Sequence, residues 1–162
     1  MVDLIASFIV LTRIIFLLTS LKLLIDSRLS ISGLDSPSVF YCWSLKDARK
    51  ILRNIGNHKK ILLIGAGFIG SIIMEALFLS GFEVTLAESS DQMVPGMMDK
   101  TGGRLVKTWC EGKGVNVYTS SLVTLIEHIN GGLRATTIDG RRIEADCIFV
   151  ATGVQPNIHF LK

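Results

Sequence analysis

The chain has 162 residues, 49% of them hydrophobic and 19% charged, and this composition excludes an intrinsically disordered protein. Its 17 basic and 14 acidic residues give a net charge of +3 that is scattered along the sequence, so no nucleic-acid partner is expected. The three cysteines, at positions 42, 110 and 147, match neither a disulfide framework nor a zinc-binding spacing, so no metal site is expected.

The first predicted element is an apolar segment, residues 4–25, in which 16 of 22 residues are apolar. As a helix it would be about 33 Å long, which is enough to cross a bilayer. Arg13 and Lys22 interrupt the segment, and its acidic start does not match a cleaved secretory signal. Two interpretations stay open: a membrane-associated or spanning helix, and a segment buried against the protein or a partner. We expect a cytoplasmic protein, with membrane contact through residues 4–25 as the open alternative.

A turn at residues 33–37 is followed by a short helix. Ser44 is a suitable N-cap, and apolar residues follow at helical spacing: Leu45, Ala48, Ile51 and Leu52. The polar stretch 54–60 ends this helix. We therefore expect residues 1–33 to form an apolar N-terminal segment and residues 34–59 a linker with a short helix.

Residues 60–88 have the pattern of a strand, a helix and a second strand. The apolar run 61–64 suits a strand buried on both faces of a parallel sheet. Apolar residues then recur on one helical face, at Ile69, Ile72, Ile73, Ala76 and Leu77. Gly81 is placed to end the helix, and residues 82–87 are rich in strand-forming side chains. Together they predict a βαβ unit.

The second half of the chain predicts a helix over 99–111 and a strand over 115–120. Three further strand-like runs follow, 122–129, 133–138 and 141–145, separated by the hairpin turns Asn130-Gly131 and Asp139-Gly140. A last buried strand covers 147–150. The predicted fold class is α/β, a Rossmann-like domain over 60–153 with a parallel sheet and an inserted three-stranded antiparallel meander. Residues 154–162 are expected to form a tail.

The turn after the first buried strand has the pattern GxGxxG, which is typical of a dinucleotide site. The first glycine allows a tight turn, the second lets a pyrophosphate approach the backbone, and the third allows close packing of helix on strand. The helix that follows directs unpaired N–H groups at the phosphates. The expected cofactor-binding residues of this turn are Gly65, Ala66, Gly67, Phe68, Ile69 and Gly70.

Glu88 ends the second strand, where a carboxylate can accept hydrogen bonds from both hydroxyls of an adenosine ribose. The same charge would repel a 2′-phosphate, and no arginine follows at 89–93, so NAD is favoured over NADP. A GxGxxG turn followed by an acidic residue is also compatible with FAD as the ligand. A further alternative is that the glycine-rich turn serves packing only and binds no nucleotide.

Three stretches resemble the NAD-binding domain of the pyridine nucleotide–disulfide oxidoreductase family: LLIGAGFIG, GFEVTLAE and EADCIFVATGVQPN. The resemblance covers residues 21–162, although Asp26 and Leu29 depart from the family pattern where the chain crosses from the flavin domain. Ile72 stands where many relatives have glutamate, which resembles the flavin subunits related to nitrite reductase or rubredoxin reductase.

The resemblance implies an oxidoreductase in which NADH reduces FAD and Gly153 lets the nicotinamide approach the flavin. The family's FAD domain and its Cys-x-x-x-x-Cys redox pair are expected to be absent here, so this chain would supply no catalytic residue. The flavin would come from a flavin-bearing chain or a homo-oligomer. The alternatives are a non-enzymatic NAD-binding regulatory module and a truncated remnant that retains nucleotide binding.

The remaining reactive side chains favour structural roles. His58, His128 and His159 lack carboxylates at ligand spacing and are expected at the surface. Cys110 is expected in the core. The methionines at 93, 97 and 98 suit packing, with a cover over the adenine as the alternative.

Overall fold

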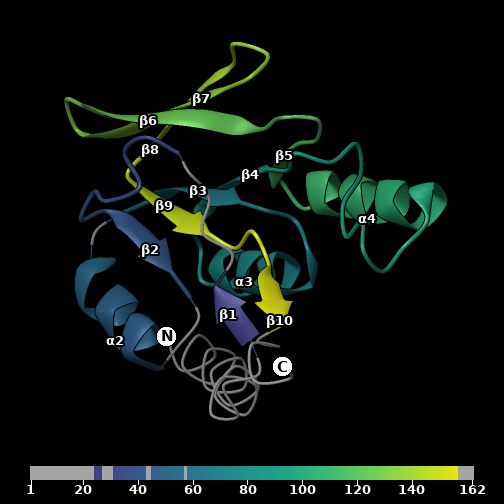
Figure 1. Ribbon diagram of the computed structural model, residues 1–162, viewed down its shortest axis with the longest axis horizontal. Helices are drawn as coiled ribbons and strands as arrows, with labels where there is room; N and C mark the ends of the chain where they lie inside the picture. Colours follow the sequence, from purple (N-terminus) through teal and green to yellow (C-terminus); the bar gives the residue numbers. More distant parts are fainter. Residues whose placement is uncertain (1–23, 27–30, 43–44, 57, 157–162) are drawn as a thin grey trace, which may run out of the picture.

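The computed structural model describes residues 24–26, 31–42, 45–56 and 58–156 (Figure 1). A five-stranded parallel sheet with the order β2-β9-β3-β4-β5 forms its centre. These strands are β2 (Val39–Tyr41), β3 (Lys60–Ile64), β4 (Glu83–Ala87), β5 (Asn116–Tyr118) and β9 (Cys147–Val150). The predicted α/β class with a parallel sheet is therefore confirmed.

Each central strand contributes to two hydrophobic cores because alternate side chains point to opposite faces. Ile61 and Leu63 of β3 belong to the core under the helices, whereas Leu62 and Ile64 belong to the core under the meander. All four side chains are buried. The continuous apolar run predicted this double burial.

Within the part of the chain that the structure describes, three helices accompany the sheet: α2 (Leu45–Asn54), α3 (Phe68–Leu79) and α4 (Lys100–Gly112). All three contribute side chains to the first core, among them Ile51, Ile73 and Cys110. Gly81 follows the end of α3 with a φ of 84°, a conformation that glycine adopts without strain. The predicted βαβ unit is confirmed in β3, α3 and β4.

The other face of the sheet carries the antiparallel meander, which forms a separate three-stranded sheet (Figure 1). Its strands are β6 (Val123–Ile129), β7 (Gly132–Thr137) and β8 (Arg142–Ala145). Gly131 and Gly140 have φ values of 92° and 79° in the two turns, as the hairpin prediction requires.

Two small features were not predicted. Residues 39–41, placed in a linker by the sequence, form β2 and pair with β9. At 154–156, where a tail was expected, β10 (Val154–Pro156) pairs antiparallel with β1 (Leu24–Asp26). Each of these strands has three residues, too few to show a period, and each depends on a partner distant in the sequence.

Most of the apolar segment 4–25, together with His159, lies outside the described residues. Within the part of the chain that the structure describes, no helix combines the length and apolar character that crossing a bilayer requires.

Candidate functional site

The carboxyl edge of the parallel sheet brings together three segments distant in the sequence. These are the turn 65–70 after β3, Glu88 after β4, and residues 151–153 after β9. Backbone hydrogen bonds join them: the Gly65 N–H donates to Ala87 O at 2.8 Å, and the Ala151 N–H donates to Ile64 O at 2.8 Å. Parallel α/β sheets bind ligands at this edge.

Two glycines of the turn are enclosed by backbone. Gly65 has a φ of 101°, and a Cβ there would lie 2.5 Å from Ala151 O. A Cβ on Gly70 would lie 2.1 Å from Gly65 O. No side chain fits at either position, so these glycines allow β3, α3 and the end of β9 to approach each other closely.

Gly67 and Gly153 differ from them, because a Cβ at either position would meet no atom within 4 Å. Gly67 has an ordinary extended conformation and is the N-cap of α3. No side-chain hydrogen bond caps this end of α3, and its first turn, which lies within the described residues, contains no acidic residue. The positive end of a 12-residue helix is therefore directed at open space, an arrangement that suits an anion.

Glu88 lies beside this turn with only 7% of its surface exposed. Its Oε2 accepts a hydrogen bond from the Ala66 N–H at 2.6 Å. Its Oε1 accepts from the Ser90 N–H at 2.8 Å and from the Ser89 hydroxyl at 3.2 Å. Each carboxylate oxygen can accept about two hydrogen bonds. Oε2 can therefore accept one more hydrogen bond. Oε1 can accept another only when the Ser89 hydroxyl turns away from it.

The backbone of Glu88 is fixed by the segment that leads into the meander. The Glu88 N–H donates to Tyr118 O, and the Ser121 N–H donates to Glu88 O, both at 2.8 Å. The guanidinium of Arg141 lies 4.2 Å from the centre of the Tyr118 ring. The meander thus packs against the strand ends on which Glu88 depends.

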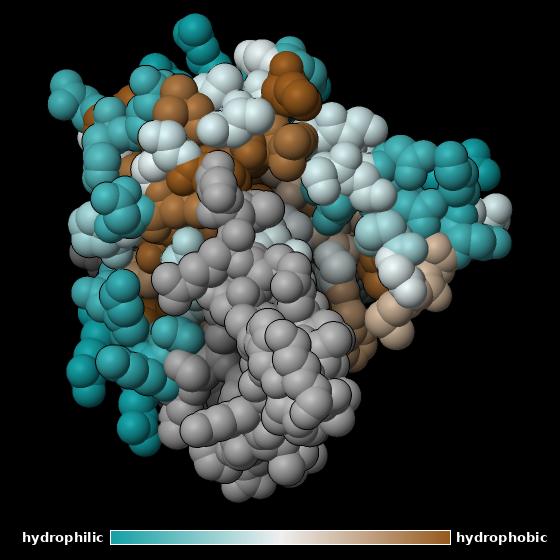
Figure 2. Space-filling view, in the orientation of Figure 1, coloured by the Kyte–Doolittle hydropathy of each residue, from teal (hydrophilic) through white to brown (hydrophobic). Residues whose placement is uncertain are grey.

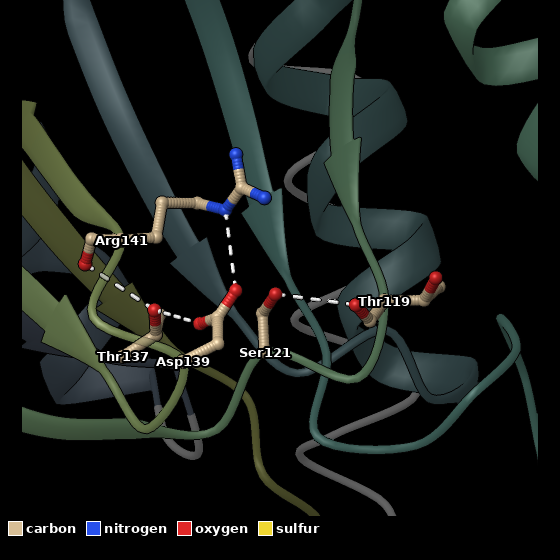
Figure 3. A network of polar contacts seen from close by, with 5 residues as sticks. All are labelled: Thr119, Ser121, Thr137, Asp139 and Arg141. Carbon is tan, nitrogen blue, oxygen red and sulfur yellow. Dashed lines mark hydrogen bonds and ion pairs between the residues drawn. The ribbon is translucent and has the colours of Figure 1, made fainter.

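A polar network stabilises this junction (Figure 3). The Ser121 hydroxyl donates to Thr119 O at 3.1 Å, and the Arg141 Nε lies 3.8 Å from an Asp139 carboxylate oxygen. The Thr137 hydroxyl is within hydrogen-bonding distance of both Asp139 and Arg141 O. This hydroxyl is the largest cause that lowers the pKa of Asp139. Thr137 and Ser121 are each 2% exposed, so the network provides partners for buried hydroxyls.

The loop after Glu88 is joined to the turn 65–70 by a backbone hydrogen bond. The Val94 N–H donates to Ala66 O at 2.8 Å, and Val94 has a φ of 50°, unusual for a β-branched residue. Met93 is fully buried in the first core, so packing accounts for it. Met97 and Met98 are exposed.

The cysteines lack the surroundings of a redox or nucleophilic site. All three are free and buried, as expected for Cys110. Burial, followed by the charges of Asp47 and Asp146 respectively, raises the pKa of Cys42 and Cys147 to about 12. Among the described residues, no group of His, Cys, Asp or Glu side chains could hold a metal ion.

A glycine-rich turn follows β3, and helix α3 begins directly after it. This arrangement on a parallel sheet defines a Rossmann-like α/β fold. A family model described as pyridine nucleotide-disulphide oxidoreductase matches residues 26–162, and the chain belongs to this family. The NADH-dependent phenylglyoxylate dehydrogenase subunit epsilon of Aromatoleum evansii is 33% identical over 132 residues, which cover 82% of this chain and 31% of that protein. The chain spans between 17% and 34% of the length of curated relatives that it matches.

Solved structures share this fold. The water-forming NADH oxidase from Lactobacillus brevis bound to NADH has a TM-score of 0.79 and 25% identity, covering 85% of this chain and 30% of that one. An FAD-dependent pyridine nucleotide-disulphide oxidoreductase from Desulfovibrio vulgaris has a TM-score of 0.73 and 29% identity, covering 85% and 36% respectively. The family assignment made from the sequence motifs is confirmed.

Proposed function

We propose that this chain binds NADH at the carboxyl edge of its parallel sheet. The observation that carries the proposal is the open space at Gly67 beside the uncapped N-terminus of α3. The pyrophosphate would lie on the 65–70 turn, with backbone N–H groups of α3 as donors. The adenosine ribose would donate to Glu88, and the nicotinamide would pass the open face of Gly153.

The site favours NADH over NADPH because the acceptor at the ribose position is a buried carboxylate. The Ala66 and Ser90 N–H groups fix Glu88 so that its charge faces the turn. Residues 89–95 contain no lysine or arginine to pair with a 2′-phosphate. A phosphorylated ribose would therefore meet the negative charge of Glu88, and the seven residues that follow Glu88 supply no cation.

In the proposed reaction NADH reduces a bound FAD, as the resemblance implies, and the chemistry of hydride transfer belongs to these cofactors. The residues of this chain bind and orient. The turn 65–70 fixes the phosphates, Glu88 fixes the ribose, and Gly153 leaves room for the nicotinamide ring. Residues 60–153 would act as the NAD-binding domain, and the flavin would be supplied from outside these residues.

The proposal is tested by titrating the purified chain with NADH and NADPH and recording cofactor fluorescence. We expect saturable NADH binding, weaker NADPH binding and no visible flavin absorbance in the protein itself. A stoichiometric flavin band would contradict a flavin supplied from outside, and an absence of saturable NADH binding would contradict the site. Binding of NADH without electron transfer to an added flavoprotein partner would favour a regulatory module.

A further inference from the structure

Helix α2 carries a stripe of basic side chains that are not part of the proposed NADH site. Lys46, Arg49, Lys50 and Arg53 recur at helical spacing and therefore share one face. All four are exposed, whereas Ile51 on another side of the helix is 1% exposed and belongs to the core. Figure 2 shows this face as a hydrophilic area over α2, at the lower left of the molecule. We call these four residues the α2 basic face.

Within the described residues, no ion pair involves the α2 basic face. Asp47 is the acidic residue of this helix, and it is half-buried rather than exposed on the stripe. The ion pairs between described residues all lie elsewhere in the chain. The Lys50 Nζ lies 5.9 Å from the centre of the Phe40 ring, so its stem covers the edge of the core while its charge is exposed.

Helix α4 differs, although it is also rich in basic residues. Lys100 is paired with Asp91 at 2.8 Å, and Lys107 donates to Thr119 at 3.2 Å. The exposed surface of α4 also includes Leu105 and Trp109. On α2, by contrast, the exposed side chains that the structure describes are the four cations and Asn54.

We propose that the α2 basic face docks on the anionic surface of a lipid bilayer. The exposed side chains that the structure describes on α2 include a stripe of long cations, which matches a diffuse layer of lipid phosphates. An acidic protein partner would be expected to meet aromatic or apolar residues at the centre of its contact. The described part of α2 exposes none.

The sequence before α2 supports a bilayer as the partner. Residues 4–25 are strongly apolar and contain Arg13 and Lys22. A cluster of four or more Lys and Arg side chains that follows a membrane-associated segment is attracted to anionic lipid headgroups. The α2 basic face would be such a cluster, independently of the proposed NADH site.

The proposal is tested by sedimenting the full chain with vesicles of phosphatidylcholine alone or mixed with phosphatidylglycerol. We expect a preference for the anionic vesicles that weakens as salt is raised. The quadruple variant Lys46→Gln, Arg49→Gln, Lys50→Gln, Arg53→Gln is expected to bind anionic vesicles at least about tenfold more weakly. Its binding to phosphatidylcholine should not change, because that binding does not depend on these charges.

A matched control neutralises two lysines and two arginines elsewhere: Lys100→Gln, Arg104→Gln, Lys113→Gln and Arg142→Gln. The control is expected to keep most of the anionic preference. An equal loss in both variants would show that net charge alone is responsible, and equal binding of the wild type to both vesicle types would also overturn the proposal. Binding of α2 to soluble poly-glutamate but not to vesicles would identify a protein-docking face instead. Circular dichroism confirms that each variant is folded.

Discussion

Four glycines at one edge of the sheet fall into two pairs with opposite surroundings. Gly65 and Gly70 are enclosed, with backbone oxygens 2.5 Å and 2.1 Å from the position of a Cβ. Gly67 and Gly153 face open space within 4 Å. The same residue type therefore serves packing in one pair and leaves room for a ligand in the other. The surroundings of Gly65, Gly67 and Gly70 agree with the order of roles that the GxGxxG motif predicts, whereas Gly153 lies outside the motif.

Two carboxylates show a similar contrast at opposite edges of the sheet. Glu88 accepts backbone N–H groups at the carboxyl edge, beside open space. Asp146 accepts the N–H groups of Lys59 and Lys60 at 2.6 Å and 2.9 Å, where β3 begins. A carboxylate bound to backbone amides is therefore not in itself a ligand site, and we expect only Glu88 to affect cofactor binding.

The largest expected effect is that of Gly70→Ala, which tests the enclosed pair. The new Cβ would overlap Gly65 O, a backbone atom that cannot move without displacing β3. We expect a loss of roughly 3 kcal/mol or more in the free energy of unfolding. Denaturant unfolding followed by circular dichroism measures this loss.

Gly112→Ala is the matched control, because Gly112 also lies in a helix but a Cβ there would meet nothing within 4 Å. It should leave stability unchanged or raise it by up to about 1 kcal/mol. Equal effects of the two substitutions would show that the close approach at Gly70 does not matter.

Glu88→Gln is expected to have the next largest effect, because it removes the charge with almost no change in side-chain size. The amide oxygen can still accept the Ala66 N–H, so the turn 65–70 should keep its structure, whereas the Ser90 N–H loses its acceptor because the amide NH2 group would face it. Loss of the charge should weaken NADH binding and should narrow the preference for NADH over NADPH by about fivefold or more. Competitive titration with both nucleotides measures the ratio, and an unchanged ratio would mean that Glu88 does not face the ribose.

Asp146→Asn tests the carboxylate at the opposite edge. Burial raises the pKa of Asp146, but the backbone N–H groups of Lys60 and Lys59 and the charges of His58 and Lys60 outweigh it, so the pKa is lowered overall. Its stabilising contribution is therefore present above the unfolded pKa of about 3.9 and is lost as pH falls through the lower folded pKa.

We expect Asp146→Asn to reduce the free energy of unfolding at neutral pH by about 1 kcal/mol. In the variant this free energy should fall less steeply as the pH is lowered. NADH affinity should stay the same. If Asp146→Asn weakened NADH binding as much as Glu88→Gln does, the claim that only Glu88 affects cofactor binding would be contradicted. Unfolding curves at several pH values and one cofactor titration decide this.

Ser89→Ala is expected to have the smallest effect. The Ser89 hydroxyl occupies an acceptor position on Glu88 Oε1 that a ribose hydroxyl would use. Removing this competitor should strengthen NADH binding by roughly two- to fivefold, the value of a weak hydrogen bond. Weaker binding in the variant would instead show that Ser89 itself contacts the cofactor.

Much of the fold could be predicted because local periodicity and turn chemistry agree with it. The apolar run of β3, the helical spacing of α3 and the Asn-Gly and Asp-Gly turns each specify their element without reference to the rest of the chain. The position of Glu88 beside the glycine turn also follows from the βαβ connection.

Features that depend on distant partners could not be predicted. The strand β2 forms because Val39–Tyr41 can pair with β9, more than 100 residues later in the sequence. Gly103 lies in α4 although glycine weakens helices, since a Cβ there would lie 2.7 Å from Met93 O. The hydrogen bond from Ala66 to Glu88 also has no signal in the sequence.

The most direct test of the proposed function is the affinity for NADH of Gly67→Val compared with that of Gly112→Val. Both glycines have open surroundings and neither has a positive φ, so both variants should fold. We expect Gly67→Val to weaken NADH binding at least about tenfold, because its side chain would occupy the place of the pyrophosphate, while Gly112→Val binds like the wild type. Equal affinities for NADH in the wild type and in folded Gly67→Val would contradict the proposed site.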